Sequence, residues 1–127
     1  MKPEEMKQAI HHYVDAYNRF DMDGMIGLLA PDIRFENVSG GTVNAKIHGK
    51  TEFEILARES AQLFASRKQT IKTIQILGNR AFAEIDFEGV LVQDFPNGLK
   101  AGEKIVLQGT TEFLFTNGLI SSIVDKS

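Results

Sequence analysis

The sequence predicts an α+β fold in which three helices in the first half of the chain cover one face of a mainly antiparallel sheet. Near the N-terminus, apolar residues recur every three or four positions, which is typical of an amphipathic helix. Beyond residue 67, apolar and polar residues alternate, which is typical of strands with one buried face. The pair Asn117-Gly118 separates two such runs and predicts a tight hairpin.

The first helix is expected over residues 4–20. Its apolar stripe consists of Met6, Ile10, Tyr13, Tyr17 and Phe20. A second, short helix is expected over residues 25–30, with Asp23 as its N-cap and Pro31 just beyond its end. A third helix is expected over about residues 50–66. Its apolar side consists of Phe53, Leu56, Ser60, Leu63 and Phe64.

The strands are expected at residues 33–36, 68–77, 81–92, 104–116 and 119–124. Residues 39–42, which read Ser-Gly-Gly-Thr, are expected to form a polar loop, and Pro96-Asn97-Gly98 opens a longer one. Alternation along residues 81–91 places Ala81, Ala83, Ile85, Phe87 and Leu91 on one face. Glu84, Asp86 and Glu88 fall on the other face, which we expect to be solvated. The reverse register would turn this acidic row toward a pocket.

Composition excludes several functional classes. The chain has 127 residues and no cysteine, which predicts a single domain over residues 1–127 without disulfides or thiolate metal sites. A net charge of −3 argues against binding to nucleic acid. No apolar stretch is long enough for a signal peptide or a membrane span, so we expect a cytoplasmic protein that does not bind membranes. His11 and His12 are adjacent and point apart on a helix; neither a metal nor a cofactor is expected.

Several segments resemble the nuclear transport factor 2-like superfamily, specifically its SnoaL-like and ketosteroid-isomerase-like members. They are residues 13–18 (Tyr-Val-Asp-Ala-Tyr-Asn), 21–24, 28–35 (Leu-Leu-Ala-Pro-Asp-Ile-Arg-Phe), 49–50 and 113–120. The resemblance implies a cone-shaped barrel of a strongly curved sheet, with a deep pocket between the helices and the concave face. It also implies a homodimer that pairs through the convex face of the sheet.

The resemblance to ketosteroid isomerases carries over only in part. Their hydrogen-bonding tyrosine falls on Tyr13, but their general-base aspartate falls on Asn37, whose amide cannot accept a proton at a useful pH. Their protonated aspartic acid falls near Thr111, whose hydroxyl donates a weaker hydrogen bond. The steroid isomerase mechanism is therefore not expected.

The SnoaL-like cyclases resemble this chain at another position. Their acid–base aspartate lies on the last strand and matches Asp125, although the tryptophan that often precedes it is Val124 here. The resemblance thus implies Asp125 as the base, with Tyr13 or Thr111 as a hydrogen-bond donor, in cofactor-free chemistry at a carbonyl. The alternative for Asp125 is a solvated position near the end of the chain.

We expect a pocket for a small lipophilic or polyketide-like molecule, which is either transformed by a cyclase-like or isomerase-like reaction or only bound. The alternative is a non-catalytic module that binds a ligand or a partner protein. Besides Asp125 and Tyr13, the expected pocket residues are Tyr17, Phe35, Asn37, His48, Phe53, Phe64, Leu107, Thr111, Phe113 and Phe115. Both tyrosines have a plain alternative as core residues, Asn37 as a turn residue, Thr111 as a sheet-bonded residue and His48 as a surface residue.

Overall fold

The computed structural model describes residues 1–96 and 98–127, in which three helices accompany a six-stranded mixed sheet. The helices are α1 (Pro3–Asn18), α2 (Met22–Ile26) and α3 (Lys50–Ala61). The strands are β1 (Leu29–Ser39), β2 (Thr42–His48), β3 (Phe64–Leu77), β4 (Arg80–Leu91), β5 (Lys104–Thr116) and β6 (Leu119–Lys126). This confirms the α+β class. Of the loop predicted at residues 96–98, Asn97 lies outside the described residues.

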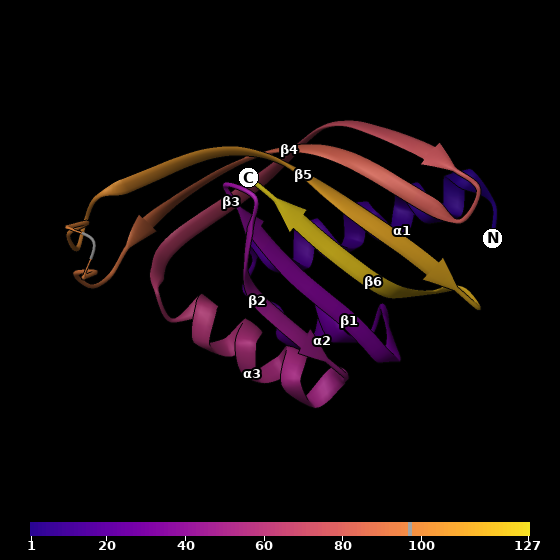
Figure 1. The fold of residues 1–127 in the computed structure, drawn as a ribbon, viewed down its shortest axis with the longest axis horizontal. Coiled ribbons are helices and arrows are strands. Elements are labelled where there is room, and N and C mark those ends of the chain that lie inside the picture. Colours follow the sequence, from indigo (N-terminus) through magenta and orange to yellow (C-terminus); the bar gives the residue numbers. More distant parts are fainter. Residues whose placement is uncertain (97) are drawn as a thin grey trace.

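The sheet is curved but open. Its strand order is β2-β1-β6-β5-β4-β3, and neighbouring strands are antiparallel except β1 and β6, which are parallel. Figure 1 shows β3, β4 and β5 as long bent strands, with α1 behind the sheet and α3 beside β1 and β2. Among the described residues no hydrogen bonds join the edge strands β2 and β3, so the sheet has the curvature of the expected barrel without its closure.

Helix α1 begins as its local sequence favours, but it ends at Asn18 rather than at residue 20. Pro3 stands in the first turn, and the Glu5 carboxylate accepts a hydrogen bond of 2.7 Å from the backbone N–H of Lys2. The predicted apolar stripe is confirmed, because Met6, Ile10 and Tyr13 are buried and the rest of the stripe packs against the core.

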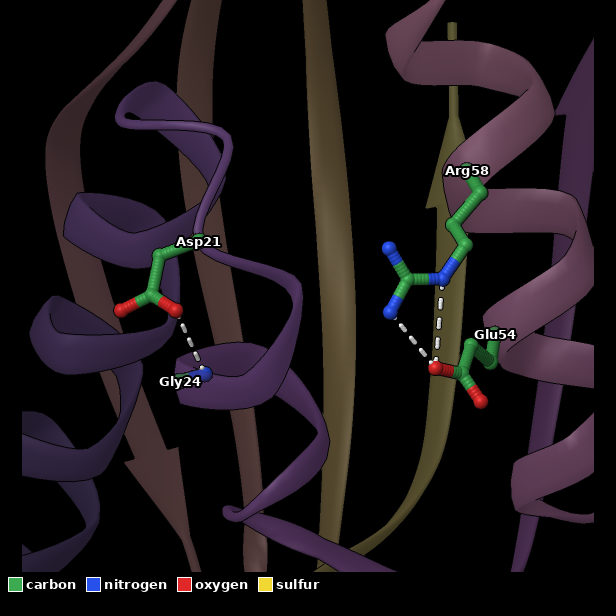
Figure 2. Close-up of polar contacts among 4 residues, drawn as sticks. All are labelled: Asp21, Gly24, Glu54 and Arg58. Atoms are coloured by element: carbon green, nitrogen blue, oxygen red, sulfur yellow. Dashed lines mark hydrogen bonds and ion pairs between the residues drawn. The ribbon is translucent and has the colours of Figure 1, made fainter.

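Helix α2 differs from the prediction at both ends. Its N-cap is Asp21 rather than Asp23, because the Asp21 carboxylate accepts a hydrogen bond of 2.9 Å from the backbone N–H of Gly24 (Figure 2). The helix ends at Ile26 because the next residues join the sheet. There the backbone carbonyl of Leu28 accepts a hydrogen bond of 3.0 Å from the N–H of Ile120. Tertiary pairing thus overrides the helical pattern that we expected to continue to residue 30.

The segments flanking α3 also belong to the sheet. Residues 42–48, which include part of the predicted loop, form β2, and its pairing with β1 includes a bulge after Asn37. Helix α3 ends at Ala61 rather than at residue 66, because Phe64 pairs with Leu91 of β4. On the surface of α3, Arg58 and Glu54 form an ion pair at 2.8 Å (Figure 2).

The predicted register of β4 is confirmed. Ala81, Ala83 and Ile85 are buried on the concave face, whereas Glu84 and Glu88 are exposed on the other. Two acids of this outer row pair with lysines of the neighbouring strands, Asp86 with Lys72 at 3.9 Å and Glu88 with Lys104 at 3.0 Å. The acidic row therefore faces away from the space between helices and sheet. No helix in the described part of the chain has the length and hydropathy of a membrane span.

Candidate functional site

A cavity of about 320 Å³ lies between the helices and the concave face of the sheet. Every helix and strand contributes at least one residue to its wall. Ten of the predicted site residues line it: Tyr13, Tyr17, Phe35, Asn37, Phe53, Phe64, Leu107, Thr111, Phe113 and Asp125. The fold thus brings residues from both ends of the chain to a single cavity.

Two predicted site residues lie elsewhere. Phe115 follows the same strand face as Phe113 but is only 2% exposed and belongs to the core. His48 is exposed at the end of β2, opposite Arg34 of β1, and its backbone N–H donates a hydrogen bond to the Glu52 carboxylate at 3.1 Å. The surface alternative therefore describes His48, which ends strand β2 and does not line the cavity.

Asp125 and Thr111 form a hydrogen-bonded pair in the cavity wall. They stand opposite each other on the antiparallel strands β6 and β5, and the Thr111 hydroxyl donates to Oδ1 of Asp125 at 2.7 Å. Burial raises the pKa of Asp125 to about 6, and the hydrogen bond from Thr111 lowers it by a smaller amount. At neutral pH the carboxylate is therefore largely ionised but ready to take up a proton.

Tyr13 lies on α1 and lines the same cavity. It is 6% exposed, and its ring meets Phe113 edge to face with the ring centroids 6.0 Å apart. Burial holds the pKa of Tyr13 well above its usual range, and the negative charge of Asp125 raises it further. Its hydroxyl therefore stays protonated and remains a hydrogen-bond donor at any physiological pH.

Aromatic rings make up much of the remaining wall. Phe35 of β1 meets Phe53 of α3 edge to face at 5.9 Å, and Phe64 of β3 meets Phe87 of β4 in the same way at 5.5 Å. Leu107 lines the cavity but is 48% exposed. Such a wall favours an apolar ligand held by a few polar groups.

Asn37 lines the cavity, and its amide is used within the β1–β2 hairpin. Its Nδ2 donates a hydrogen bond of 2.7 Å to Oδ1 of Asn44, whose own Nδ2 donates to the Ser39 hydroxyl at 3.2 Å. Asn37 therefore organises the hairpin at its bulge. It supplies no proton acceptor of the kind that the ketosteroid isomerases have at this place.

Sequence reasoning missed Arg67, a buried cation in the cavity wall. This side chain is 5% exposed, lies at the start of β3, and holds its guanidinium 3.7 Å from the ring centroid of Tyr17. The signal was present, because Arg67 and Gln69 have the same strand parity as Ile71, which packs against the core. Because Arg67 and Gln69 are polar, the alternation of apolar and polar residues does not reveal that these two positions face the cavity.

The charged groups in the wall are few. They are Asp125, Arg67 and the exposed Lys126, which pairs with Glu112 at 2.9 Å. In the part of the chain that the structure describes, no three histidine, aspartate or glutamate side chains lie where they could share a metal ion. The wall thus offers one carboxylate as an acid or base, hydroxyls as hydrogen-bond donors, and one buried guanidinium.

Solved structures with this fold span several named activities. A putative polyketide cyclase from Xanthomonas campestris is 22% identical, with a TM-score of 0.78 over 98% of this chain and 90% of its own. TsrD from Streptomyces laurentii is 21% identical, with a TM-score of 0.81 over 98% and 89%. An LEH-like epoxide hydrolase from Mycobacterium tuberculosis is 18% identical, with a TM-score of 0.77 over 97% and 82%. At these identities the likeness shows the fold.

Among curated protein sequences, none matches this chain significantly. The family model of the SnoaL-like domain, in contrast, matches residues 10–123, which include the second half of α1, both other helices and the sheet up to Ile123 of β6. Since this match covers most of the chain, the protein belongs to the SnoaL-like domain family.

Proposed function

We propose that the cavity binds a small, largely apolar carbonyl compound and that Asp125 moves a proton at the carbon next to its carbonyl group. The observation that carries this proposal is the pair formed by Asp125 and Thr111 in the cavity wall, at 2.7 Å. A base for this reaction must be ionised yet basic, and it must sit where water competes little for it.

Asp125 is ionised yet basic, and its backbone is fixed within the sheet. Its pKa of about 6 keeps it ionised at neutral pH while making it more basic than an exposed carboxylate. Its backbone is held between β5 and β1, because it pairs with Thr111 on one side and with Asn37 on the other. A base on a central strand is held in place more firmly than one on a loop.

Tyr13 supplies the complementary group. Removing a proton beside a carbonyl places negative charge on the carbonyl oxygen, and a buried hydroxyl that stays protonated stabilises this charge. The raised pKa of Tyr13 reflects both its burial and the nearby Asp125, so that the acid and the base share one site. In this step the carbon gives its proton to Asp125, and its electron pair moves into the carbonyl group.

Relatives with this fold support a small-molecule ligand. The solved structures include putative polyketide cyclases and an epoxide hydrolase, whose designations name reactions of small organic molecules. The aromatic wall and the cavity volume of about 320 Å³ suit a molecule with one or two rings.

Deuterium exchange tests this function directly. The probe is 2-tetralone, a neutral bicyclic ketone, and proton NMR in D₂O follows the loss of the protons next to its carbonyl. We expect wild-type protein to accelerate exchange, Asp125→Asn to remove most of the acceleration, and Tyr13→Phe to reduce it. Glu84→Gln, on the outer face of β4, is the matched control and should exchange like wild type. Unchanged exchange in Asp125→Asn contradicts the role of Asp125.

The second candidate function is non-catalytic binding by the same cavity. The observation that favours it is Asn37, which occupies the place of the ketosteroid isomerase base and ties its amide to Asn44 at 2.7 Å. Binding of 2-tetralone without any acceleration of exchange supports this second function. Mass spectrometry of small molecules released from natively purified protein identifies the physiological ligand in either case.

A further inference from the structure

Arg67 carries a buried hydrogen-bond donor that the protein leaves unused. The residue is only 5% exposed, and its Nη2 atom is shielded from solvent without a hydrogen-bond partner among the described residues. Buried guanidinium nitrogens are normally paired, because a buried donor without an acceptor has lost its hydrogen bonds to water and gained none in return. The unpaired Nη2 therefore calls for an explanation beyond packing.

The rest of this side chain has a clear structural role. Its Nε donates a hydrogen bond of 3.0 Å to the backbone carbonyl of Tyr17, at the C-terminal end of α1. Its guanidinium lies over two aromatic rings, 3.7 Å from the centroid of Tyr17 and 4.4 Å from that of Phe20. These contacts fix the plane of the guanidinium, so that Nη2 is held in one direction.

The end of α1 is built to hold this arrangement. Phe20 has a φ of 58° and adopts the left-handed position after the helix that glycine usually occupies. A bulky residue strains the backbone at this position, and its ring completes the stack on Arg67. Asn18 then joins α1 to β3, because its side chain exchanges two hydrogen bonds with the backbone of Gln69, at 2.7 and 3.0 Å.

The positive charge of Arg67 also lacks a counterion. In residues 1–96 and 98–127, none of the ion pairs includes it, although Arg67 lines the same cavity as Asp125. Burial lowers the pKa of Arg67 from its ordinary value, which means that the surroundings stabilise its charge poorly. An anion bound in the cavity would supply both the missing counterion and the missing acceptor.

We propose that Arg67 is the binding site for an acidic group of the ligand, and that the cavity takes small aromatic or alicyclic carboxylic acids. A carboxylate suits the site because guanidinium nitrogens and carboxylate oxygens match in geometry and charge. This ligand class rests on the function proposed above. It restricts the expected ligands from apolar carbonyl compounds in general to those that also carry an acidic group.

The two charged groups of the cavity wall fit such a ligand. Tyr13 and Tyr17 line the same cavity as Arg67 and Asp125, and each tyrosine interacts electrostatically with both charged groups. A ligand held by its acid at Arg67 would extend along these rings toward Asp125. The acid then acts as the anchor, and the carbonyl group is presented to the base.

Binding of a matched pair of ligands tests the inference. The probes are 2-naphthylacetate and 2-naphthylacetamide, which share one ring system and differ in charge, measured by isothermal titration calorimetry near neutral pH. We expect wild-type protein to bind the acid about ten- to a hundredfold more tightly than the amide, as for a hydrogen bond to a charged group. In Arg67→Gln the preference should disappear while affinity for the amide is kept. Arg67→Lys should retain part of the preference.

A second measurement covers the case in which Arg67→Gln does not fold. In wild-type protein labelled with ¹⁵N-arginine, the Nε resonance of Arg67 should shift on addition of the acid and move little with the amide. The control variant is Lys104→Gln, because Lys104 and Arg67 both line a second hollow between β3, β4 and β5. It should leave the preference for the acid unchanged.

Other outcomes separate the two proposals. If the amide binds as tightly as the acid, or if Lys104→Gln removes the preference, the inference about Arg67 is overturned while the apolar cavity keeps its support. If neither ligand binds and neither changes the Arg67 resonance, the proposed ligand class fails, together with the inference built on it.

Discussion

The Thr111 hydroxyl on β5 donates a hydrogen bond of 2.7 Å to the Asp125 carboxylate on β6. Burial of this carboxylate raises its pKa, and the hydrogen bond opposes the rise. Because the two effects have opposite signs and come from different groups, mutation can separate them. The same pair therefore gives measurable consequences for stability as well as for the proposed chemistry.

The first prediction concerns the dependence of stability on pH. The pKa of Asp125 rises from 3.8 in the unfolded chain to about 6 in the fold, so the folded state binds this proton more tightly. The resulting stabilisation is complete below the unfolded pKa and is lost as the pH rises through the folded pKa, by about 3 kcal/mol. Urea unfolding at a series of pH values measures this loss.

The variant Asp125→Asn should not show this loss of stability with rising pH, because the asparagine amide does not titrate. The control Glu84→Gln, which removes an exposed carboxylate from the outer face, should keep it. A wild-type protein with the same pH profile as Asp125→Asn would show that Asp125 has an ordinary pKa in the fold.

The second prediction separates the hydrogen bond from burial. Thr111→Val removes the donor while keeping a similar volume, so that the pKa of Asp125 should rise further, above about 6. Thr111→Ser restores a hydroxyl and should bring the pKa back toward that of the wild type. Carboxyl-detected NMR titration of Asp125 measures both shifts. A pKa that falls in Thr111→Val would contradict this account of the pair.

The third prediction concerns the hydrogen bonds that connect the end of α1 to β3. Asn18→Ala removes two hydrogen bonds to the backbone of Gln69 and leaves those backbone groups without their partner. We expect it to lower the free energy of unfolding by about 1–3 kcal/mol. Asn44→Ala removes exposed hydrogen bonds to Asn37 and Ser39 and should cost about 0.5 kcal/mol or less. Chemical denaturation of both variants checks the contrast, which equal losses would contradict.

The fourth prediction concerns the ring contact at the cavity wall. A Cβ added at Gly89 would lie 2.8 Å from two ring carbons of Phe64 and 3.0 Å from Cζ of Phe87. Both rings line the cavity, so we expect Gly89→Ala to displace them and to cost about 1–3 kcal/mol. Thermal unfolding measures the loss. Restored stability in Gly89→Ala combined with Phe64→Leu would confirm that the ring is the obstacle.

Sequence patterns predicted the fold where local and tertiary preferences agree. The apolar stripe of α1 is buried as expected, and Asn117 and Gly118 adopt φ values of 53° and 80°, which suit the predicted two-residue hairpin. The predictions failed where pairing with a distant strand decided the local conformation. Leu29 pairs with Ile120, 91 positions away by residue number, and no short pattern around Leu29 reports that partner.

The candidate site was predictable to a different degree. Side chains alternate between the two faces of a strand, so an aromatic residue in step with other apolar residues is expected to point inward. This alternation identified Phe35 and Phe113. Arg67 was not, because a polar residue at an inward position resembles an outward one until the register of its strand is known. The link between Asp125 and Thr111 likewise depends on the pairing of β5 with β6, which the hairpin at residues 117–118 sets.

Because β1 pairs with β6, the last strand of the chain is required to complete the sheet. β6 lies between β1 and β5, so it alone joins the β1–β2 hairpin to the β3–β5 meander within the sheet. During synthesis the two halves cannot combine into one sheet until residues 119–126 have emerged from the ribosome. The strand that carries Asp125 thus also connects the two parts of the sheet, and any chain that has completed its sheet has already placed Asp125 opposite Thr111.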